Sequence, residues 1–152
     1  MLLLPLKYKQ RPIKPWTEWR LLIRVAALIG CIRLGLQVLS YKRTSALVKR
    51  TSNPRMNRDE LPFDERRRLI WAVRALSKRM LNTKPCLTQS LALLWLLRRR
   101  GEDVHVQIGV RKNDAGEFAA HAWLEKEGRV LIGGQMSPAN YALLKRSGVN
   151  LS

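Results

Sequence analysis

The sequence predicts an α+β fold in which several helices come first and a small antiparallel sheet follows. Up to residue 100, apolar residues recur at helical spacing in three segments. Between residues 104 and 132 they alternate with polar residues, and turn residues separate the runs. A chain of 152 residues with 46% apolar residues is long and apolar enough for one folded domain. Helices followed by strands in separate parts of a chain are typical of the α+β class.

The first predicted helix runs from Trp16 to Leu39. Its apolar stretch, Leu21 to Ile32, is interrupted by Arg24 and is shorter than the roughly 20 residues that span a bilayer. We therefore expect a helix that packs on the core. The alternative is a helix at a membrane interface, which Trp16, Trp19 and the flanking Lys and Arg residues would suit. Cys31 lies within the apolar stretch and is expected to be a small buried hydrophobe.

The next two segments differ in how clearly they predict a helix. Tyr41 to Arg58 is polar and basic, with one or two helical turns expected at Ser45 to Val48. Asp64 to Leu81 is strongly periodic, and its predicted inward stripe is Leu69, Val73, Leu76 and Met80. Its basic face is predicted to be solvated or to receive an acidic peptide segment; that face contains Arg66, Arg67, Arg74 and Lys78.

A central buried helix is predicted at Leu91 to Leu97, because this run is apolar on every side. Arg98 to Arg100 place positive charge on its last turn, where the helix dipole favours it. Gly101 then ends the helix.

Cys86 is predicted to stand at the start of this helix. Pro85 suits a first helical position, with Thr83 or Lys84 as the cap. A cysteine at the positive end of a helix dipole is in an environment that favours the thiolate. Cys86 is therefore a candidate nucleophile.

Three strands are expected after this helix, followed by a short helix near the end of the chain. The predicted strands are Val104 to Arg111, Phe118 to Glu125, and Arg129 to Ile132. Residues 112–117 form the first predicted turn, and residues 126–128 form the second. Pro138 to Leu144 is predicted to be a short helix.

A thiol nucleophile needs a base, and His121 on the second predicted strand is the candidate. His105 lies in a strand that alternates cleanly, so we expect an exposed or edge histidine there. The alternative for Cys86 is an inert buried thiol. Two cysteines and two histidines at these spacings match no standard zinc set, so no zinc site is expected.

A catalytic histidine also needs a partner that fixes its orientation and tautomer. Glu125 shares a strand face with His121, but four residues along a strand is roughly 13 Å. The amides of Gln135 and Asn140 are the candidates that remain for this orienting role.

Four segments carry a family resemblance. They are Pro85-Cys86-Leu87, the Leu-rich helix that ends at Arg98-Arg99-Arg100-Gly101, Ile108-Gly109-Val110-Arg111, and Phe118 to Glu125. Together they resemble the transglutaminase-like proteins of lasso-peptide biosynthesis, the leader peptidases related to the C-terminal domain of the microcin-processing B proteins. The resemblance covers about Leu69 to Gly134, and Arg33 to Leu36 fits the basic, helical lead-in of that family more loosely.

The resemblance implies a papain/transglutaminase-like core at residues 59–152, with a buried Cys helix packed on a small antiparallel sheet. Residues 1–58 would be a basic N-terminal helical extension. The implied activity is removal of the leader peptide from a lasso-peptide precursor by a cysteine peptidase with Cys86 and His121. The implied partners are the precursor, a separate leader-recognition protein and an asparagine-synthetase-like macrolactam cyclase.

One departure from the family weakens this expectation. The family places its orienting aspartate about a dozen residues after the histidine, near Gly133 in this chain. The segment from Arg129 to Gly134 contains no acidic residue. The alternative function is therefore a catalytically impaired transglutaminase-like scaffold that binds peptide or partner proteins.

The charge of the chain predicts an anionic partner for its N-terminal part. Of the net +18, residues 1–58 carry +12, from 13 Lys and Arg against one Glu. An acidic peptide or a membrane surface fits this charge. Ten aromatic residues without a repeated platform make nucleic acid an unexpected partner.

The absence of a signal-peptide pattern and the use of only two cysteines predict a cytoplasmic protein, with peripheral contact to the inner membrane face through its basic N-terminus.

Overall fold

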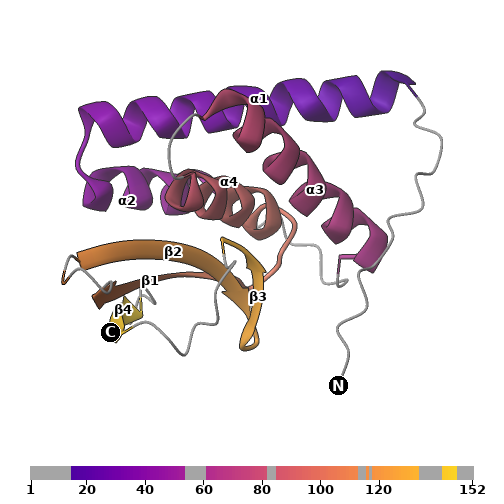
Figure 1. The fold of residues 1–152 in the computed structure, drawn as a ribbon. Coiled ribbons are helices and arrows are strands. Elements are labelled where there is room, and N and C mark those ends of the chain that lie inside the picture. Colours follow the sequence, from indigo (N-terminus) through magenta and orange to yellow (C-terminus); the bar gives the residue numbers. More distant parts are fainter. Residues whose placement is uncertain are drawn as a thin grey trace.

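The computed structural model of the chain describes residues 15–53, 61–81, 85–112, 116, 118–133 and 142–146. Within these residues the helices are α1 (Pro15–Val38), α2 (Tyr41–Thr51), α3 (Phe63–Met80) and α4 (Cys86–Arg98). The strands are β1 (His105–Lys112), β2 (Phe118–Lys126), β3 (Arg129–Ile132) and β4 (Ala142–Arg146). Helices precede strands, which confirms the α+β prediction (Figure 1).

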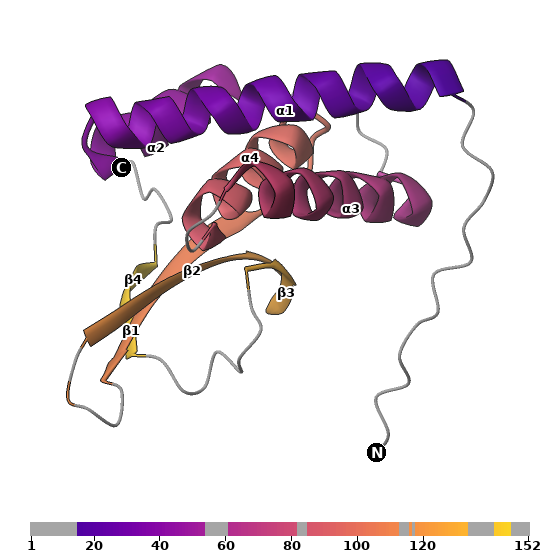
Figure 2. The same cartoon turned by 45° about the horizontal axis from the view of Figure 1, so that its top comes forward.

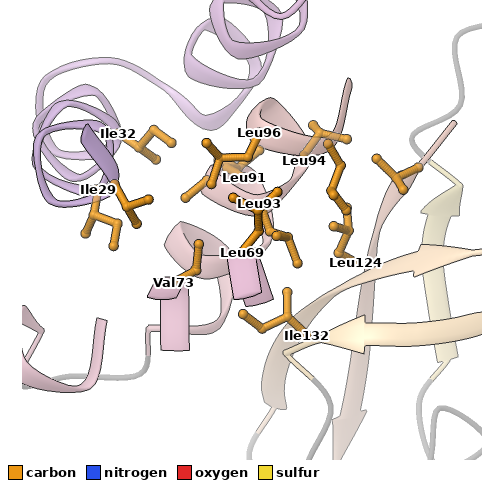
Figure 3. Packing of buried hydrophobic residues seen from close by; sticks show 14 of the residues in the cluster. Ile29, Ile32, Leu69, Val73, Leu91, Leu93, Leu94, Leu96, Leu124 and Ile132 are labelled. Atoms are coloured by element: carbon orange, nitrogen blue, oxygen red, sulfur yellow. The ribbon is translucent and has the colours of Figure 1, made fainter. Parts of the chain in front are cut away.

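Helix α4 is the centre of the fold. It contacts α1, α2, α3 and the strands β1, β2 and β3. Figures 1 and 2 show it between α1 and the sheet. Leu91, Leu93 and Leu97 are fully buried, as the all-round apolar sequence predicted. Figure 3 shows α4 leucines meeting apolar side chains of α1, α3 and the sheet. Burial of each such leucine contributes about 1.5–3 kcal/mol to folding.

The end of α4 also follows the prediction. Gly101 adopts φ 84°, which a glycine tolerates without steric cost. The Glu102 N–H donates to the Leu97 carbonyl and the Gly101 N–H donates to the Arg98 carbonyl. This pair of bonds is a Schellman motif, and it satisfies carbonyls that would otherwise lack a partner.

Helix α2 is longer than the sequence predicted. Thr44, Ser45 and Val48 are its buried residues, so two of its three inward positions are polar and give little hydrophobic signal. The Thr44 hydroxyl donates to the Ser40 carbonyl, which satisfies it locally. Gly35 on α1 allows α2 to come close at Thr44, because a Cβ on residue 35 would lie 3.2 Å from the Thr44 methyl.

Helix α3 confirms part of its predicted stripe. Leu69 and Val73 are buried, but the inward position of the last turn is Ser77. Its hydroxyl donates to the Val73 carbonyl, so it can be buried without an unsatisfied group. The prediction that Met80 points inward was wrong, since this side chain is exposed.

The four strands form one antiparallel sheet in the order β3-β2-β1-β4. A two-residue turn joins β2 to β3, with positive φ at both Glu127 and Gly128, which is the signature of a type I′ hairpin.

The predicted helix at Pro138 to Leu144 was wrong for residues 142–144, which belong to β4. Pairing with the open edge of β1 determines this conformation, and local sequence does not encode that contact. Residues 138–141 lie outside the described residues.

Helix α1 packs on the core through Val25, Ile29 and Ile32, which share one apolar cluster with residues of α3, α4 and the sheet. This confirms the expected packing, while the proposed division at residue 58 stays a prediction.

Cys31 was predicted to be buried, and this was wrong, because the helix turns it outward. The expectation of a short apolar run was also wrong: Glu18–Val38 is long and apolar enough to cross a membrane by length and composition.

A buried carboxylate ties the helical layer to the sheet. Glu102 accepts a hydrogen bond from Arg66 at 2.7 Å and lies 2.8 Å from the Lys126 ammonium. Burial alone would raise the pKa of Glu102, but the hydrogen bonds and charges of Lys126 and Arg66 hold it below its ordinary value. The prediction that Arg66 belongs to a solvated face was therefore wrong.

Candidate functional site

Cys86 is the first residue of α4, as predicted. Pro85 occupies the N-cap position and not the first helical position, and its carbonyl accepts from the Gln89 N–H at 2.8 Å. Thr83 and Lys84, the predicted caps, lie outside the described residues. Cys86 is a free, half-buried thiol at the positive end of the α4 dipole.

Ser90 fixes the first turn below Cys86. This residue is fully buried, and its hydroxyl donates to the Cys86 carbonyl at 2.7 Å. The bond satisfies a polar group that would be costly to bury alone. It also makes Ser90 part of the surface against which neighbouring segments pack near Cys86.

His121 lies on β2, directly opposite Gly109 on β1. Its Nε2–H donates a hydrogen bond to the carbonyl of Gly133. Trp123 lies on the same side of the strand, and the two rings stack with centroids 6.5 Å apart. Trp123 is buried, so it supports one side of the His121 ring.

Gly133 joins the histidine to the cysteine helix. A Cβ on Gly133 would lie 3.1 Å from the Ser90 hydroxyl oxygen and 2.8 Å from the Trp123 Cα. The glycine is therefore wedged between α4 and the backbone of β2. Gly133, which bonds His121, therefore lies close to Ser90, which bonds the Cys86 carbonyl. The direct pairing of the Cys86 thiol with the His121 ring stays a prediction.

The rival histidine is placed as the sequence indicated. His105 is 41% exposed, and its Nε2 lies 3.4 Å from the Asp103 carboxylate. It pairs in register with Glu125, four residues along β2 from His121. This register confirms that Glu125 is too far along the strand to orient His121.

The predicted orienting amides, Gln135 and Asn140, lie outside the described residues. One group that bonds His121 is the Gly133 backbone, which sequence reasoning missed because it sought a side chain. The available signal was positional: the residue a dozen positions after His121 is a glycine. Among the described residues, no group of three His, Cys, Asp or Glu is placed to hold a metal ion.

An open hollow lies where β1 ends and β2 begins. Its described lining residues are Val110, Arg111, Lys112, Phe118 and Ala142. Val110 pairs with the residue that precedes His121 on β2. Two cations and an exposed aromatic ring make this hollow suitable for an extended peptide that carries acidic and apolar groups.

Comparison with known proteins agrees with this arrangement at the level of the family. Residues 23–146 match the family model described as the transglutaminase-like superfamily. No curated protein and no solved structure matches the chain. The match begins within α1 and ends with β4, so it covers most of the chain, including Cys86 and His121. The chain therefore belongs to the transglutaminase-like superfamily.

Proposed function

We propose that the protein is a cysteine peptidase that removes the leader peptide from a lasso-peptide precursor. The Cys86 sulfur attacks the scissile carbonyl while His121 accepts the thiol proton. The backbone N–H at the start of α4 stabilises the oxyanion. His121 then donates its proton to the leaving amine, and the amide C–N bond breaks. Water, deprotonated by His121, cleaves the thioester and restores the free thiol.

The observation that carries this proposal is the hydrogen bond between His121 and Gly133. The bond holds the imidazole at Gly133, where an added Cβ would lie 3.1 Å from the hydroxyl of Ser90, one helical turn from Cys86. Membership of a superfamily that includes cysteine peptidases supports the same chemistry. The substrate class rests on the sequence resemblance to leader peptidases.

The partners follow from the same resemblance. A separate leader-recognition protein would deliver the precursor, and an asparagine-synthetase-like cyclase would close the macrolactam. The hollow at the end of β1 and the start of β2 offers a path for the precursor, since Arg111 and Lys112 favour acidic segments. These reactions would take place in the cytoplasm.

The test is cleavage of the cognate precursor in the presence of its recognition partner, followed by mass spectrometry. Release of the intact leader by the wild-type protein is expected. The observation that supports the scaffold alternative is the lack of an acidic residue between Arg129 and Gly133. An inactive wild-type protein that still binds its partners normally would support the scaffold and reject the peptidase.

We also propose that α1 contacts an anionic membrane surface. Trp19, Ile23, Leu34 and Val38 are exposed on this helix. Arg20 and Arg24 are exposed beside them. Apolar and cationic side chains on one exposed helix face suit the headgroup region of anionic lipid.

Vesicle binding tests this contact. The double substitution of Ile23 and Leu34 with Asp should weaken binding to phosphatidylserine vesicles by about 10-fold or more. It removes apolar side chains that would be buried in the membrane, and its two negative charges are repelled by the anionic lipid. Phe118→Asp, at an equally exposed apolar residue on β2, is the matched control and should bind as the wild type does. Equal binding to the vesicles by all three proteins would reject the membrane contact. Binding of an acidic peptide by the same face of α1 would then replace it.

A further inference from the structure

The His121–Gly133 hydrogen bond has a chemical consequence for the histidine. A backbone carbonyl can only accept a hydrogen bond, so the His121 Nε2 must carry the proton in this arrangement. In the neutral ring the other nitrogen, Nδ1, is then unprotonated and has the lone pair that a base needs. The bond therefore selects one of the two imidazole tautomers.

The position of Gly133 is tightly determined. Its φ is +92°, a conformation that side chains rarely adopt. A Cβ would also collide with the carbonyl oxygen of Ala122 and approach the Trp123 Cα to 2.8 Å. Both neighbours belong to the backbone of β2, which is held in register on its other side by β1. Neither can move aside without breaking strand pairing.

The same packing explains why no acidic side chain stands at this position. An aspartate at residue 133 would need the left-handed backbone and the space that β2 already fills. The carbonyl is the one hydrogen-bonding acceptor that a glycine can offer at this place. The carbonyl thus occupies the role that the sequence resemblance assigns to an acid.

We propose that the Gly133 carbonyl positions His121, fixing its Nε2–H tautomer and leaving Nδ1 to accept the Cys86 proton. The task of Nδ1 rests on the proposed function, whereas the tautomer is a property of the folded chain alone. A neutral carbonyl stabilises the charged imidazolium less than a carboxylate does, because it carries no opposite full charge. The site would therefore keep the orientation of a catalytic triad but lack its negative charge.

The tautomer can be measured without substrate. In ¹⁵N-labelled protein, long-range ¹H–¹⁵N correlation of the His121 ring at alkaline pH should show a protonated Nε2 and an unprotonated Nδ1. The second histidine, His105, is more exposed and serves as the internal reference. A protonated Nδ1, or shifts averaged between the two tautomers, would overturn the proposal. Because this measurement uses the wild-type protein, it does not depend on the folding of a variant.

A pair of glycine variants tests the consequence for Cys86. Gly133→Ala should give averaged tautomers at His121 and lower precursor cleavage by about 10²-fold or more. Gly128→Ala is the matched control, because Gly128 also has positive φ (+76°) but a Cβ added there would meet no atom within 4 Å. It should leave the tautomer unchanged and cleavage within about 2-fold of wild type, since it imposes only local backbone strain.

The outcomes separate this inference from the proposed function. A fixed Nε2–H tautomer in a protein that cleaves no precursor would retain the positioning role of Gly133 and reject the peptidase. Efficient cleavage with His121 in the Nδ1–H form would retain the peptidase and reject the positioning role. Equal effects of Gly133→Ala and Gly128→Ala on the His121 tautomer would also reject it, because strain alone would then account for the change.

Discussion

Substitution of Cys86 or His121 with alanine is expected to reduce precursor cleavage by at least about 10³-fold while the protein stays folded. In the proposed mechanism Cys86 forms the bond to the substrate and His121 moves the proton, so neither step proceeds without both groups. The double variant should be no worse than either single one, because members of one catalytic unit fail together. Mass spectrometry of the precursor, with the recognition partner present, measures the loss.

Matched variants are available for both residues. Cys31→Ala removes the other thiol, which is exposed on α1, and His105→Ala removes the other imidazole, which lies near Asp103 at the surface. Both should cleave at the wild-type rate. A folded Cys86→Ala protein that cleaves normally would disprove the peptidase, and additive losses in the double variant would show that the two residues act separately.

Glu102→Gln is expected to lower the free energy of unfolding by about 3 kcal/mol or more. The substitution leaves the Arg66 and Lys126 charges, both largely buried, without their common anion. Asp103→Asn is the matched control, because the Asp103 side chain is 91% exposed and should contribute little to the free energy of unfolding. Urea unfolding of the three proteins gives the comparison. A Glu102→Gln protein as stable as the control would show that the buried ion pairs do not stabilise the fold.

The pH dependence of stability should change with the same substitution. The pKa of Glu102 is lower in the folded chain than in the unfolded chain, so its contribution is complete above the ordinary glutamate pKa. That contribution is lost as the pH falls through the lowered pKa of the folded state. The wild type should therefore lose more stability than Glu102→Gln on acidification below about pH 4. Parallel pH profiles for the two proteins would contradict this linkage.

The elements with strong local signals were predictable from the sequence. The α4 run has an apolar residue at nearly every position from Leu91 to Leu97, so any helix formed there must be buried. The hairpin between β2 and β3 was marked by Gly128 at a position that requires positive φ. The candidate nucleophile and base could be named because cysteine and histidine are scarce in this chain.

The features that the sequence did not predict depend on contacts between distant segments. The β4 strand forms against the edge of β1, and the inward face of α2 is polar because local hydrogen bonds satisfy Thr44. Cys31 was placed by composition alone, although the rotation of α1 on α3 and α4 decides its exposure. The partner of His121 at Gly133 is a main-chain carbonyl, and every residue has one, so no residue type could identify it.

The activation of Cys86 by His121 is tested most directly by alkylation with iodoacetamide, read residue by residue with mass spectrometry. Cys31 is the internal reference, because it is a free thiol and is more exposed than Cys86. Near neutral pH, Cys86 should label faster than Cys31 in the wild type, and this advantage should disappear in His121→Ala. Slower labelling of Cys86 than of Cys31, unchanged by His121→Ala, would contradict a catalytic pair.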